Sequence, residues 1–459
     1  MKSIDPATGK VIKSYAEYSV PKTEGILRET EHAFGVWHGF SFKERALVMI
    51  NAARFLRKNR ERYARLMANE MGKPFAQGIQ EIEKCAGVCD FYARHAGRFL
   101  SDEFIRTDAA RSYVRYAPLG IVLAVMPWNF PFWQVFRCAA PTLMAGNAMV
   151  LKHASNVCGC ALAIEEVFKT GGFPSGLFRT VLVGGSKVER LIRHPLVRAV
   201  TLTGSTGAGK AVAAAAGAVV KKTVLELGGS DPYLVLADAD LEQAVQTCVA
   251  SRLINAGQSC VAAKRFIVVN KVLKKFEELF VQNMRSQRMG PPLEDGVTLG
   301  PLARHDLRGQ VHAQVQKSVK AGACVLLGGR IPQGPGAFYP PTVLGNVCPG
   351  MPAYNEEIFG PVASLIAVRD EREGIRAAND TVFGLGAAVF TRDLKRGERI
   401  AAQELQAGSC FVNDFVRSDP RLPFGGIKQS GYGRELSVCG SREFVNIKTV
   451  HVGKTPSLK

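Results

Sequence analysis

The sequence contains no cysteine and histidine pattern typical of a structural metal site. None of its 11 cysteines belongs to a C-x-x-C pair. Cys85 and Cys89 lie close together, as do Cys158 and Cys160, but no histidine lies at zinc-site spacing from either pair. The odd number of cysteines also disfavours a disulfide framework. We therefore predict neither a bound metal nor structural disulfides.

The sequence also shows no pattern typical of a targeting or membrane-spanning segment. The first ten residues, MKSIDPATGK, lack the charged-then-apolar pattern of a secretory signal and do not resemble an Arg- and Ser-rich transit peptide. The longest apolar stretch, 119–128, is too short to span a bilayer and ends in a turn-like proline. These absences predict a cytoplasmic enzyme or binding protein without a membrane partner.

The chain lacks clustered basic residues although it is strongly basic overall. It has 59 Lys and Arg against 40 Asp and Glu, a net charge of +19. Nucleic-acid binding is one interpretation of such a charge. However, no run of five basic residues occurs, and no aromatic residues alternate with the basic ones. We predict no specific nucleic-acid partner, and instead a basic surface that attracts anionic substrates and phosphate-bearing cofactors.

The apolar periodicity predicts an α/β protein. At 459 residues the chain is long enough for two or three domains. Residues 43–100 follow a helical period, and the alanine-rich run 211–220 is also expected to be helical. Short apolar strands alternate with helices from 111 onward, in one series before Cys260 and a second after it. Such repeats predict two doubly wound α/β domains, with ligands at the carboxyl ends of parallel strands and Cys260 near the junction.

A glycine-rich turn lies between a predicted strand and a predicted helix at 203–211, TGSTGAGKA. Gly204, Gly209 and Lys210 match the start of a P-loop, but Ala211 stands where a magnesium-binding Ser or Thr is needed. The G-x-G-x-x-G pattern also fails, because residue 212 is not glycine. A kinase or nucleotidase is therefore disfavoured. A modified dinucleotide-binding turn or a simple structural turn remains.

Seven ordered motifs resemble the NAD(P)-dependent aldehyde dehydrogenase superfamily over nearly the whole chain. They are MPWNFPFWQ (126–134), LKHAS (151–155), TLTGST (201–206), LELGGSDP (225–232), NAGQSC (255–260), EEIFGPV (356–362) and LPFGGIKQSGYGRE (422–435). In LKHAS, ELGGSDP and SDPRLPFGGIKQSGYGREL the chain most resembles bacterial succinate-semialdehyde dehydrogenases.

The resemblance identifies Cys260 as a nucleophile, Glu226 as a general base and Asn129 as an oxyanion donor. Oxidation of an aldehyde requires hydride to leave a carbon that already carries an oxyanion, and a thiolate forms that adduct well. Cys260 follows Gly257 at a predicted helix start, which would lower the pKa of its thiol. Glu226 lies 34 residues before the cysteine, at the family spacing. It would take a proton from the water that cleaves the thioester, and its apolar neighbours should raise its pKa. Taken singly, these residues are also compatible with packing, capping and turn roles.

The resemblance also implies a dinucleotide site. The matching positions are Trp128, Lys152, Ser155, Gly204, Ser205, Leu227, Glu357 and Phe359. At Ser155, NAD-preferring relatives usually carry a glutamate, whose carboxylate would repel a 2′-phosphate. A serine beside Lys152 would accept that phosphate. We therefore predict NADP as cofactor, with NAD as the alternative. A second interpretation of Ser155 is a helix N-cap.

The substrate-binding residues implied by the resemblance are Arg137 and Ser418. A semialdehyde carries a carboxylate, which requires a cation and hydroxyl donors. Arg417 and Arg421 flank Ser418, whereas Ile254 stands where some relatives have a second arginine, and Arg252 is a candidate replacement. We predict NADP-dependent oxidation of succinate semialdehyde to succinate. The alternatives are an aldehyde dehydrogenase of broader range, which would include glutarate semialdehyde and uncharged aldehydes, and a non-catalytic binding protein.

The expected fold is aldehyde dehydrogenase-like, with a Rossmann-type cofactor domain, an α/β catalytic domain and a small β oligomerisation element. The predicted boundaries are 1–100 and 119–228 for the first, 229–430 for the second, and 101–118 with 440–459 for the third. The last strand-like segment, 442–453, has no partner near it in sequence, so we expect it to pair with another subunit. A homodimer or homotetramer is predicted.

Overall fold

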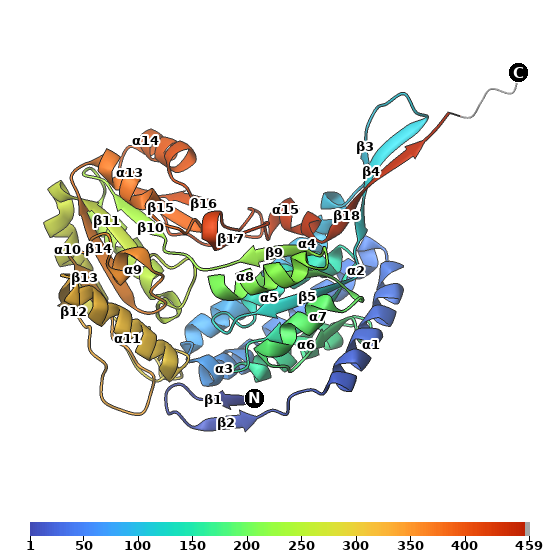
Figure 1. Cartoon of the computed structure of the whole chain (residues 1–459), viewed down its shortest axis with the longest axis horizontal. Helices are drawn as coiled ribbons and strands as arrows, with labels where there is room; N and C mark the ends of the chain where they lie inside the picture. The colour runs from blue at the N-terminus through green and yellow to red at the C-terminus, as the bar shows by residue number, and fades with distance from the viewer. Residues whose placement is uncertain (455–459) are drawn as a thin grey trace, which may run out of the picture.

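A computed structural model describes residues 1–454 of the chain as an α/β fold with two large sheets and two small ones (Figure 1). This confirms the predicted fold class. The chain begins with a hairpin of β1 (Lys2–Ile4) and β2 (Val11–Ser14). Four helices follow: α1 (Val20–His38), α2 (Phe42–Lys58), α3 (Arg60–Met71) and α4 (Phe75–Phe99).

Local sequence signals explain where these helices begin and end. Ser41 and Glu44 form a capping box at the start of α2, with the Ser41 side chain accepting from the backbone N–H of Glu44. Gly72 ends α3 in a left-handed conformation, with φ of 78°. The buried faces of α2 and α3 both pack against α4, beside the first large sheet.

The first large sheet has six strands in the order β17-β9-β8-β5-β6-β7. All neighbours are parallel except β17, which pairs antiparallel with β9. The strands are β5 (Ile121–Met126), β6 (Ala148–His153), β7 (Phe178–Thr180), β8 (Val197–Thr203), β9 (Lys222–Glu226) and β17 (Gly431–Tyr432). The connecting helices are α5 (Trp133–Met144), α6 (Cys158–Thr170), α7 (Val188–Arg193) and α8 (Thr206–Gly217). The predicted alanine-rich helix thus ends at Gly217, because the chain turns there and Val220 takes a positive φ of 54°.

The second large sheet has seven strands in the order β12-β13-β14-β11-β10-β15-β16, of which only β12 is antiparallel to its neighbour. They are β10 (Pro232–Val235), β11 (Arg265–Val269), β12 (Cys324–Leu327), β13 (Thr342–Gly345), β14 (Val362–Val368), β15 (Gly386–Phe390) and β16 (Ser409–Val412). Its helices are α9 (Leu241–Leu253), α10 (Asn270–Arg285), α11 (His305–Lys320), α12 (Pro352–Asn355), α13 (Glu371–Asn379) and α14 (Leu394–Arg399).

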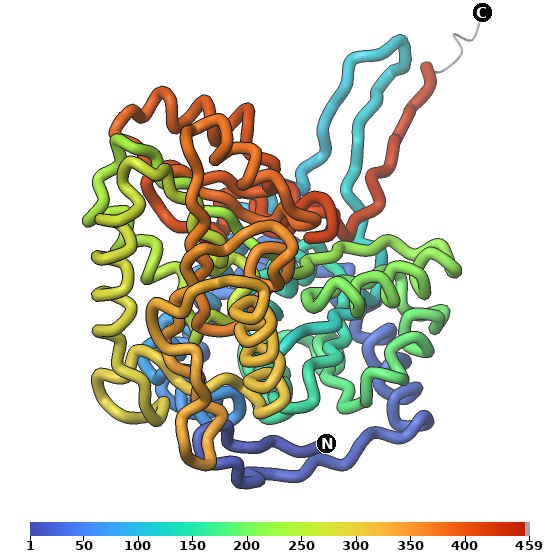
Figure 2. The backbone as a smooth tube through the Cα atoms, turned by 60° about the vertical axis from the view of Figure 1, so that its left-hand side comes forward, coloured from blue at the N-terminus to red at the C-terminus, as the bar shows by residue number. Residues whose placement is uncertain are grey.

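A three-stranded sheet projects from the body of the molecule (Figures 1 and 2). Its order is β18-β4-β3, from β3 (Glu103–Phe104), β4 (Arg111–Pro118) and, after α15 (Ser437–Glu443), β18 (Val445–Val452). The last strand therefore has a partner within its own chain, because the polypeptide returns to β4 from far along the sequence. This partner is distant in sequence, as expected, and pairing of the segment with another subunit stays a prediction. Residues 455–459 of the predicted 440–459 segment lie outside the described residues.

Two separate apolar cores underlie the two large sheets. One includes Leu123 and Phe136, the other Phe266 and Phe280. Val261, the residue after Cys260, packs against both cores. The loop that carries Cys260 therefore lies at the junction between the two sheets. The division into domains remains a prediction. In the described part of the chain, no helix combines the length and the apolar character needed to cross a membrane.

Candidate active site

The segment 254–260, here called the nucleophile loop, has an unusual backbone. Three consecutive residues adopt positive φ angles: Asn255 at 53°, Ala256 at 56° and Gly257 at 73°. Left-handed conformations are unfavourable for non-glycine residues and persist only when the surroundings impose them. A side chain at 257 would meet the Gly360 carbonyl oxygen at 2.2 Å, so only glycine fits there. The loop is thus clamped against the segment that contains Glu357 and Phe359.

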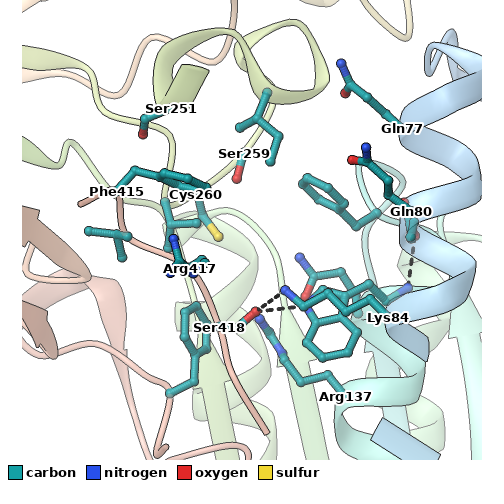
Figure 3. A pocket seen from close by; sticks show the side chains of 18 residues that line it. Gln77, Gln80, Lys84, Arg137, Ser251, Ser259, Cys260, Phe415, Arg417 and Ser418 are labelled. Atoms are coloured by element: carbon teal, nitrogen blue, oxygen red, sulfur yellow. Dashed lines mark hydrogen bonds between the residues drawn. The ribbon is translucent and has the colours of Figure 1, made fainter. Parts of the chain in front are cut away.

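The Cys260 sulfur points into a cavity of about 160 Å³ (Figure 3). Residues from α4, α5, the nucleophile loop and the segment after β16 line it. Its polar and charged lining residues include Gln77, Gln80, Glu81, Lys84, Gln134, Arg137, Ser251, Ser259, Arg417 and Ser418. Its apolar lining residues are Phe130, Trp133, Ile254, Val261, Phe415, Val416 and Phe424. The cavity can hold a small molecule beside the sulfur.

Cys260 does not begin a helix, which corrects the sequence-based expectation. It lies in a turn between the 3₁₀ segment Ile254–Gly257 and β11. Burial raises the pKa of its thiol to about 12, although Arg137 and Lys264 favour ionisation. The expected lowering of the pKa is therefore absent, because desolvation outweighs the two cations and Cys260 does not lie at the start of a helix.

Lys264 is a residue that the sequence motifs did not indicate. Its buried ammonium group donates to the carbonyl oxygens of Ser259 at 2.9 Å and Cys260 at 2.7 Å. It also lies 3.6 Å from a carboxylate oxygen of Glu357. This lysine therefore fixes the backbone of the nucleophile and connects it to the predicted cofactor-binding glutamate. In the sequence, only its position just before an apolar strand could have drawn attention to this lysine.

Glu226 lies at the carboxyl end of β9 and is buried. Neither carboxylate oxygen has a hydrogen-bond partner among the described residues. Burial raises the pKa of this carboxyl well above its usual range, and Arg137 offsets the rise in part. A side chain at Gly425 would approach a Glu226 oxygen to 2.7 Å, so this glycine leaves room for the carboxylate. A buried carboxylate with no donor partner has the character expected of a general base.

Asn129 lies in residues 127–132, which connect β5 to α5 and are called the Asn129 loop below. Its side-chain nitrogen donates to the Gln258 carbonyl oxygen at 3.1 Å, which leaves its second N–H free. Its own carbonyl oxygen accepts from the Asn255 side chain at 2.7 Å. The backbone N–H of Cys260 has no acceptor among residues 1–454. The second N–H of the Asn129 side chain and the backbone N–H of Cys260 are thus two hydrogen-bond donors that have no acceptor among the described residues.

A buried ion pair holds the end of the Asn129 loop. One Glu81 oxygen accepts from the backbone N–H groups of Phe132 and Trp133, at 2.9 Å each. The other pairs with the ammonium group of Lys73, which is as deeply buried. Sequence reasoning missed both residues, because charged residues such as Glu81 in a helix and Lys73 in a connection are normally solvated. Their role is visible only once α4 packs beneath the loop.

Replacing Glu81 with glutamine should lower the free energy of unfolding by about 3 kcal/mol, because a buried Lys73 ammonium would lose its counter-charge. Urea unfolding measures the change. Glu83→Gln is the matched control on the same helix. Glu83 pairs with Arg57 and Arg60 in a solvent-exposed position, so its loss should cost less than about 1 kcal/mol. Equal changes in the free energy of unfolding for the two substitutions would show that Glu81 is not a buried counter-charge of Lys73.

The predicted glycine turn leads from β8 into α8. Ser205 is the N-cap of α8, and its hydroxyl accepts from the Ala208 N–H at 3.3 Å. A side chain at Gly209 would meet Leu227 at 2.5 Å, so α8 packs closely on the residue after Glu226. Free N–H groups at such a helix start, with the helix dipole, suit a phosphate.

Lys152 lies near the end of β6, and Ser155 follows that strand. The alternative interpretation of Ser155 as a helix cap is wrong, because α6 begins at Cys158 and its N-cap residue is Val157. The Ser155 side chain is exposed and makes no hydrogen bond within the described residues. Lys152 is partly buried, which lowers its pKa, and none of residues 1–454 forms an ion pair with it. A free hydroxyl and an unpaired ammonium group fit a dinucleotide with a 2′-phosphate.

Loops that follow strands of the first large sheet contact the segment before β14 of the second. Trp128 of the Asn129 loop contacts Phe359 edge to face, with ring centroids 5.8 Å apart. Glu357 accepts from the backbone N–H of Gly229 at 3.0 Å. Of the predicted cofactor residues, Lys152 lies near the end of β6, and the others come from loops after β5, β6, β8 and β9 or from the segment before β14: Trp128, Ser155, Gly204, Ser205, Leu227, Glu357 and Phe359. Their roles stay predictions.

Arg137 and Ser418, the predicted substrate-binding residues, both line the cavity. The Arg137 guanidinium is buried, pairs with the carboxylate of Glu435 and lies over the Phe424 ring at 4.6 Å. Its charge favours ionisation of Cys260 and Glu226. Arg137 is therefore an ion-paired residue that acts on the charges of Cys260 and Glu226, and not an unpaired cation in the cavity.

The other arginines considered in the sequence do not replace a missing cation. Arg252 is buried outside the cavity and donates to the Gly257 carbonyl oxygen at 2.6 Å, so it does not compensate for Ile254. Arg417 lines the cavity but pairs with Asp414 at 2.8 Å. Arg421 is exposed and pairs with its neighbour Asp419.

Comparisons with known proteins agree with this geometry. The model of the aldehyde dehydrogenase family matches residues 1–450. A probable succinate-semialdehyde dehydrogenase (NADP+) from Synechocystis is 47% identical over 450 residues, covering 98% of this chain and 99% of that protein. A succinate semialdehyde dehydrogenase (NAD(P)+) from Escherichia coli is 45% identical over 448 residues, covering 98% and 97%.

Solved structures give the same result. The crystal structure of succinic semialdehyde dehydrogenase from Streptococcus pyogenes in complex with NADP+ superposes with a TM-score of 0.96 at 36% identity, and covers 99% of this chain and 100% of that chain. Because sequence and structure both match over nearly the full length, this chain belongs to the aldehyde dehydrogenase family.

Proposed function

We propose that this protein oxidises succinate semialdehyde to succinate with NADP+. The observation that carries the proposal is a cavity in which a cysteine sulfur, basic side chains and a serine hydroxyl converge. The names of the relatives at 45–47% identity, and the NADP+ complex of the Streptococcus pyogenes enzyme, support the choice of substrate and cofactor. The free Ser155 hydroxyl and the unpaired Lys152 support NADP+ over NAD+.

The side chains suggest the order of events. The Cys260 thiol releases its proton to solvent as its sulfur bonds to the aldehyde carbon, and the Asn129 side chain with the Cys260 backbone N–H stabilises the resulting oxyanion. A nicotinamide dinucleotide, which residues such as Trp128, Ser155 and Glu357 would hold, would supply the oxidising power as the hydride acceptor. The carbonyl re-forms as a thioester. Glu226 then removes a proton from water, which attacks the thioester carbon. The carbon–sulfur bond breaks, the acid is released and the thiol regains its proton.

The function is tested by comparing kcat/KM for succinate semialdehyde and for butanal, an uncharged aldehyde of the same length, with each cofactor. We expect succinate semialdehyde with NADP+ to be the best combination. The apolar side chain of Ile254 in the cavity favours a second candidate, an aldehyde dehydrogenase of broader range. Equal kcat/KM values for the two aldehydes would support that candidate. A complete lack of cofactor reduction would support a non-catalytic binding protein.

Replacing Ser155 with glutamate should lower kcat/KM for NADP+ by about 100-fold and leave that for NAD+ unchanged or higher. The new carboxylate would repel the 2′-phosphate, whereas it could accept hydrogen bonds from ribose hydroxyls. Initial rates with both cofactors measure the change. Ser286→Glu, at an exposed serine after α10, is the control for the added charge. If the ratio of kcat/KM for NADP+ to kcat/KM for NAD+ did not change, a role for Ser155 in cofactor preference would be excluded.

We also propose that the chain forms a homodimer or homotetramer through the projecting sheet. Its apolar residues Phe104, Ile105, Ile447 and Val452 are exposed. One edge of β18 has no strand beside it within the described residues. An exposed apolar sheet with a free edge is a typical protein interaction surface. The predicted cytoplasmic location stays a prediction.

A further inference from the structure

Three cationic side chains line the cavity that contains Cys260: Lys84, Arg137 and Arg417. The two arginines already have carboxylate partners, Glu435 and Asp414. Lys84, on α4, differs from both. Within residues 1–454 no carboxylate oxygen lies within 4.0 Å of its ammonium group. Lys84 is therefore the cavity-lining cation whose charge is not neutralised by a direct ion pair.

The hydrogen bonds around Lys84 leave donors free for a ligand. The Ser418 oxygen accepts from the Lys84 ammonium group at 2.9 Å and from the Trp133 indole N–H at 3.2 Å (Figure 3). With both lone pairs occupied, the hydroxyl of Ser418 can only donate its hydrogen. The Lys84 ammonium group, which also lies 4.2 Å from the centroid of the Trp133 ring, retains two more hydrogens. A positive charge and a hydroxyl donor thus adjoin each other in the cavity.

We propose that Lys84, together with the Ser418 hydroxyl, binds the distal carboxylate of the semialdehyde substrate and determines the preference for it over uncharged aldehydes. This inference rests on the proposed function and names the group that recognises the charged end of the substrate. Ion pairing with a partly desolvated ammonium group, reinforced by a hydroxyl donor, is a strong form of carboxylate recognition. Arg137 instead serves the electrostatics of Cys260 and Glu226, and its pairing with Glu435 leaves little net charge for a ligand.

The pH dependence of substrate affinity should reflect this lysine. Burial, reinforced by the Arg137 charge, lowers the pKa of Lys84 to about 8. As the pH rises through this value the ammonium group becomes neutral, so KM for succinate semialdehyde should rise while KM for butanal stays flat. The titratable and charged groups near it are Glu81 and Cys85 on its own helix, Arg137 on α5, Arg417 and Asp419 after β16, and Cys260 in the nucleophile loop.

Replacing Lys84 with methionine should raise KM for succinate semialdehyde by about 10- to 100-fold, with kcat changed less than about twofold. Methionine keeps the apolar stem but removes the charge. Kinetic constants for butanal should not change. Lys84→Arg restores a cation and should recover most of the affinity, and its KM should no longer rise above pH 8. Arg94→Met removes an exposed cation from the same helix, outside the cavity, and controls for net charge.

Two kinetic outcomes would overturn the inference: an unchanged KM for succinate semialdehyde in Lys84→Met, or equal losses with both aldehydes. Binding of succinate, measured by calorimetry without turnover, provides a readout that does not depend on the proposed reaction. We expect wild type to bind succinate and Lys84→Met to lose it. Equal succinate binding by both proteins, or none by wild type, would refute the role of Lys84. If wild type binds succinate through Lys84 but does not oxidise succinate semialdehyde, the proposed function fails and the carboxylate site stands.

Discussion

Cys260→Ser should lower kcat by at least about 1,000-fold. A serine hydroxyl is far less acidic and less nucleophilic than a thiol, and an alkoxide is a poorer leaving group than a thiolate when water attacks the acyl intermediate. The buried setting increases the difference, because it already raises the pKa of the thiol to about 12 and would disfavour an alkoxide still more. The absorbance of the reduced cofactor at saturating substrate measures kcat.

The control for this substitution is Cys324→Ser, at an exposed cysteine on β12. It should retain wild-type activity, because ten of the 11 cysteines have no role in the proposed reaction. Cofactor binding and the thermal unfolding midpoint of Cys260→Ser should match those of wild type, since the side chains have similar sizes. If Cys260→Ser turned over at a rate near that of wild type, covalent catalysis by this residue would be disproved.

Glu226→Gln should lower steady-state kcat by about 100- to 1,000-fold while the first turnover still occurs. Glutamine occupies nearly the same volume but cannot remove a proton from water, so the acyl group should remain on Cys260. Rapid mixing should show a burst of reduced cofactor, close to one per subunit, followed by a slow phase. Glu189→Gln, at an exposed glutamate that pairs with Arg193, is the control and should behave as wild type.

The pH dependence of kcat is a second test of the role of Glu226 as a base. Because burial raises the pKa of this carboxyl, a larger fraction is protonated and inactive as a base when the pH falls. Wild-type kcat should therefore decrease toward low pH through this raised pKa, whereas the slow phase of Glu226→Gln should lack that step. A variant that turns over at the wild-type rate without a burst, or that keeps the wild-type pH profile, would show that another group activates the water.

The motifs allowed the central residues to be predicted because the chemistry restricts them. The predicted nucleophilic thiol, amide donor and carboxylate base occur in ordered segments, and the structure brings Asn129 against the nucleophile loop through Gln258. The helices and strands were likewise predictable, since apolar periodicity records which face of each element is buried.

The supporting charges were not predictable in this way. Glu81 and Lys84 lie three residues apart on α4, where the sequence resembles any amphipathic helix. One of them is buried against Lys73 and the Asn129 loop, and the other faces the cavity. Lys264 is a single basic residue before a strand, and its contacts with the Ser259 and Cys260 carbonyl oxygens depend on how the loop folds back.

The sequence by itself determined the α/β architecture, the family and the residue types that can carry out the reaction, because periodicity and reactive side chains are local properties. Only the tertiary structure decided the ionisation of those side chains and which cations remain free. Arg137 is paired and Lys84 is not, since Glu435 returns to the first sheet from near the end of the chain. Burial and pairing depend on groups distant in sequence, and these contacts set the charge that a substrate meets.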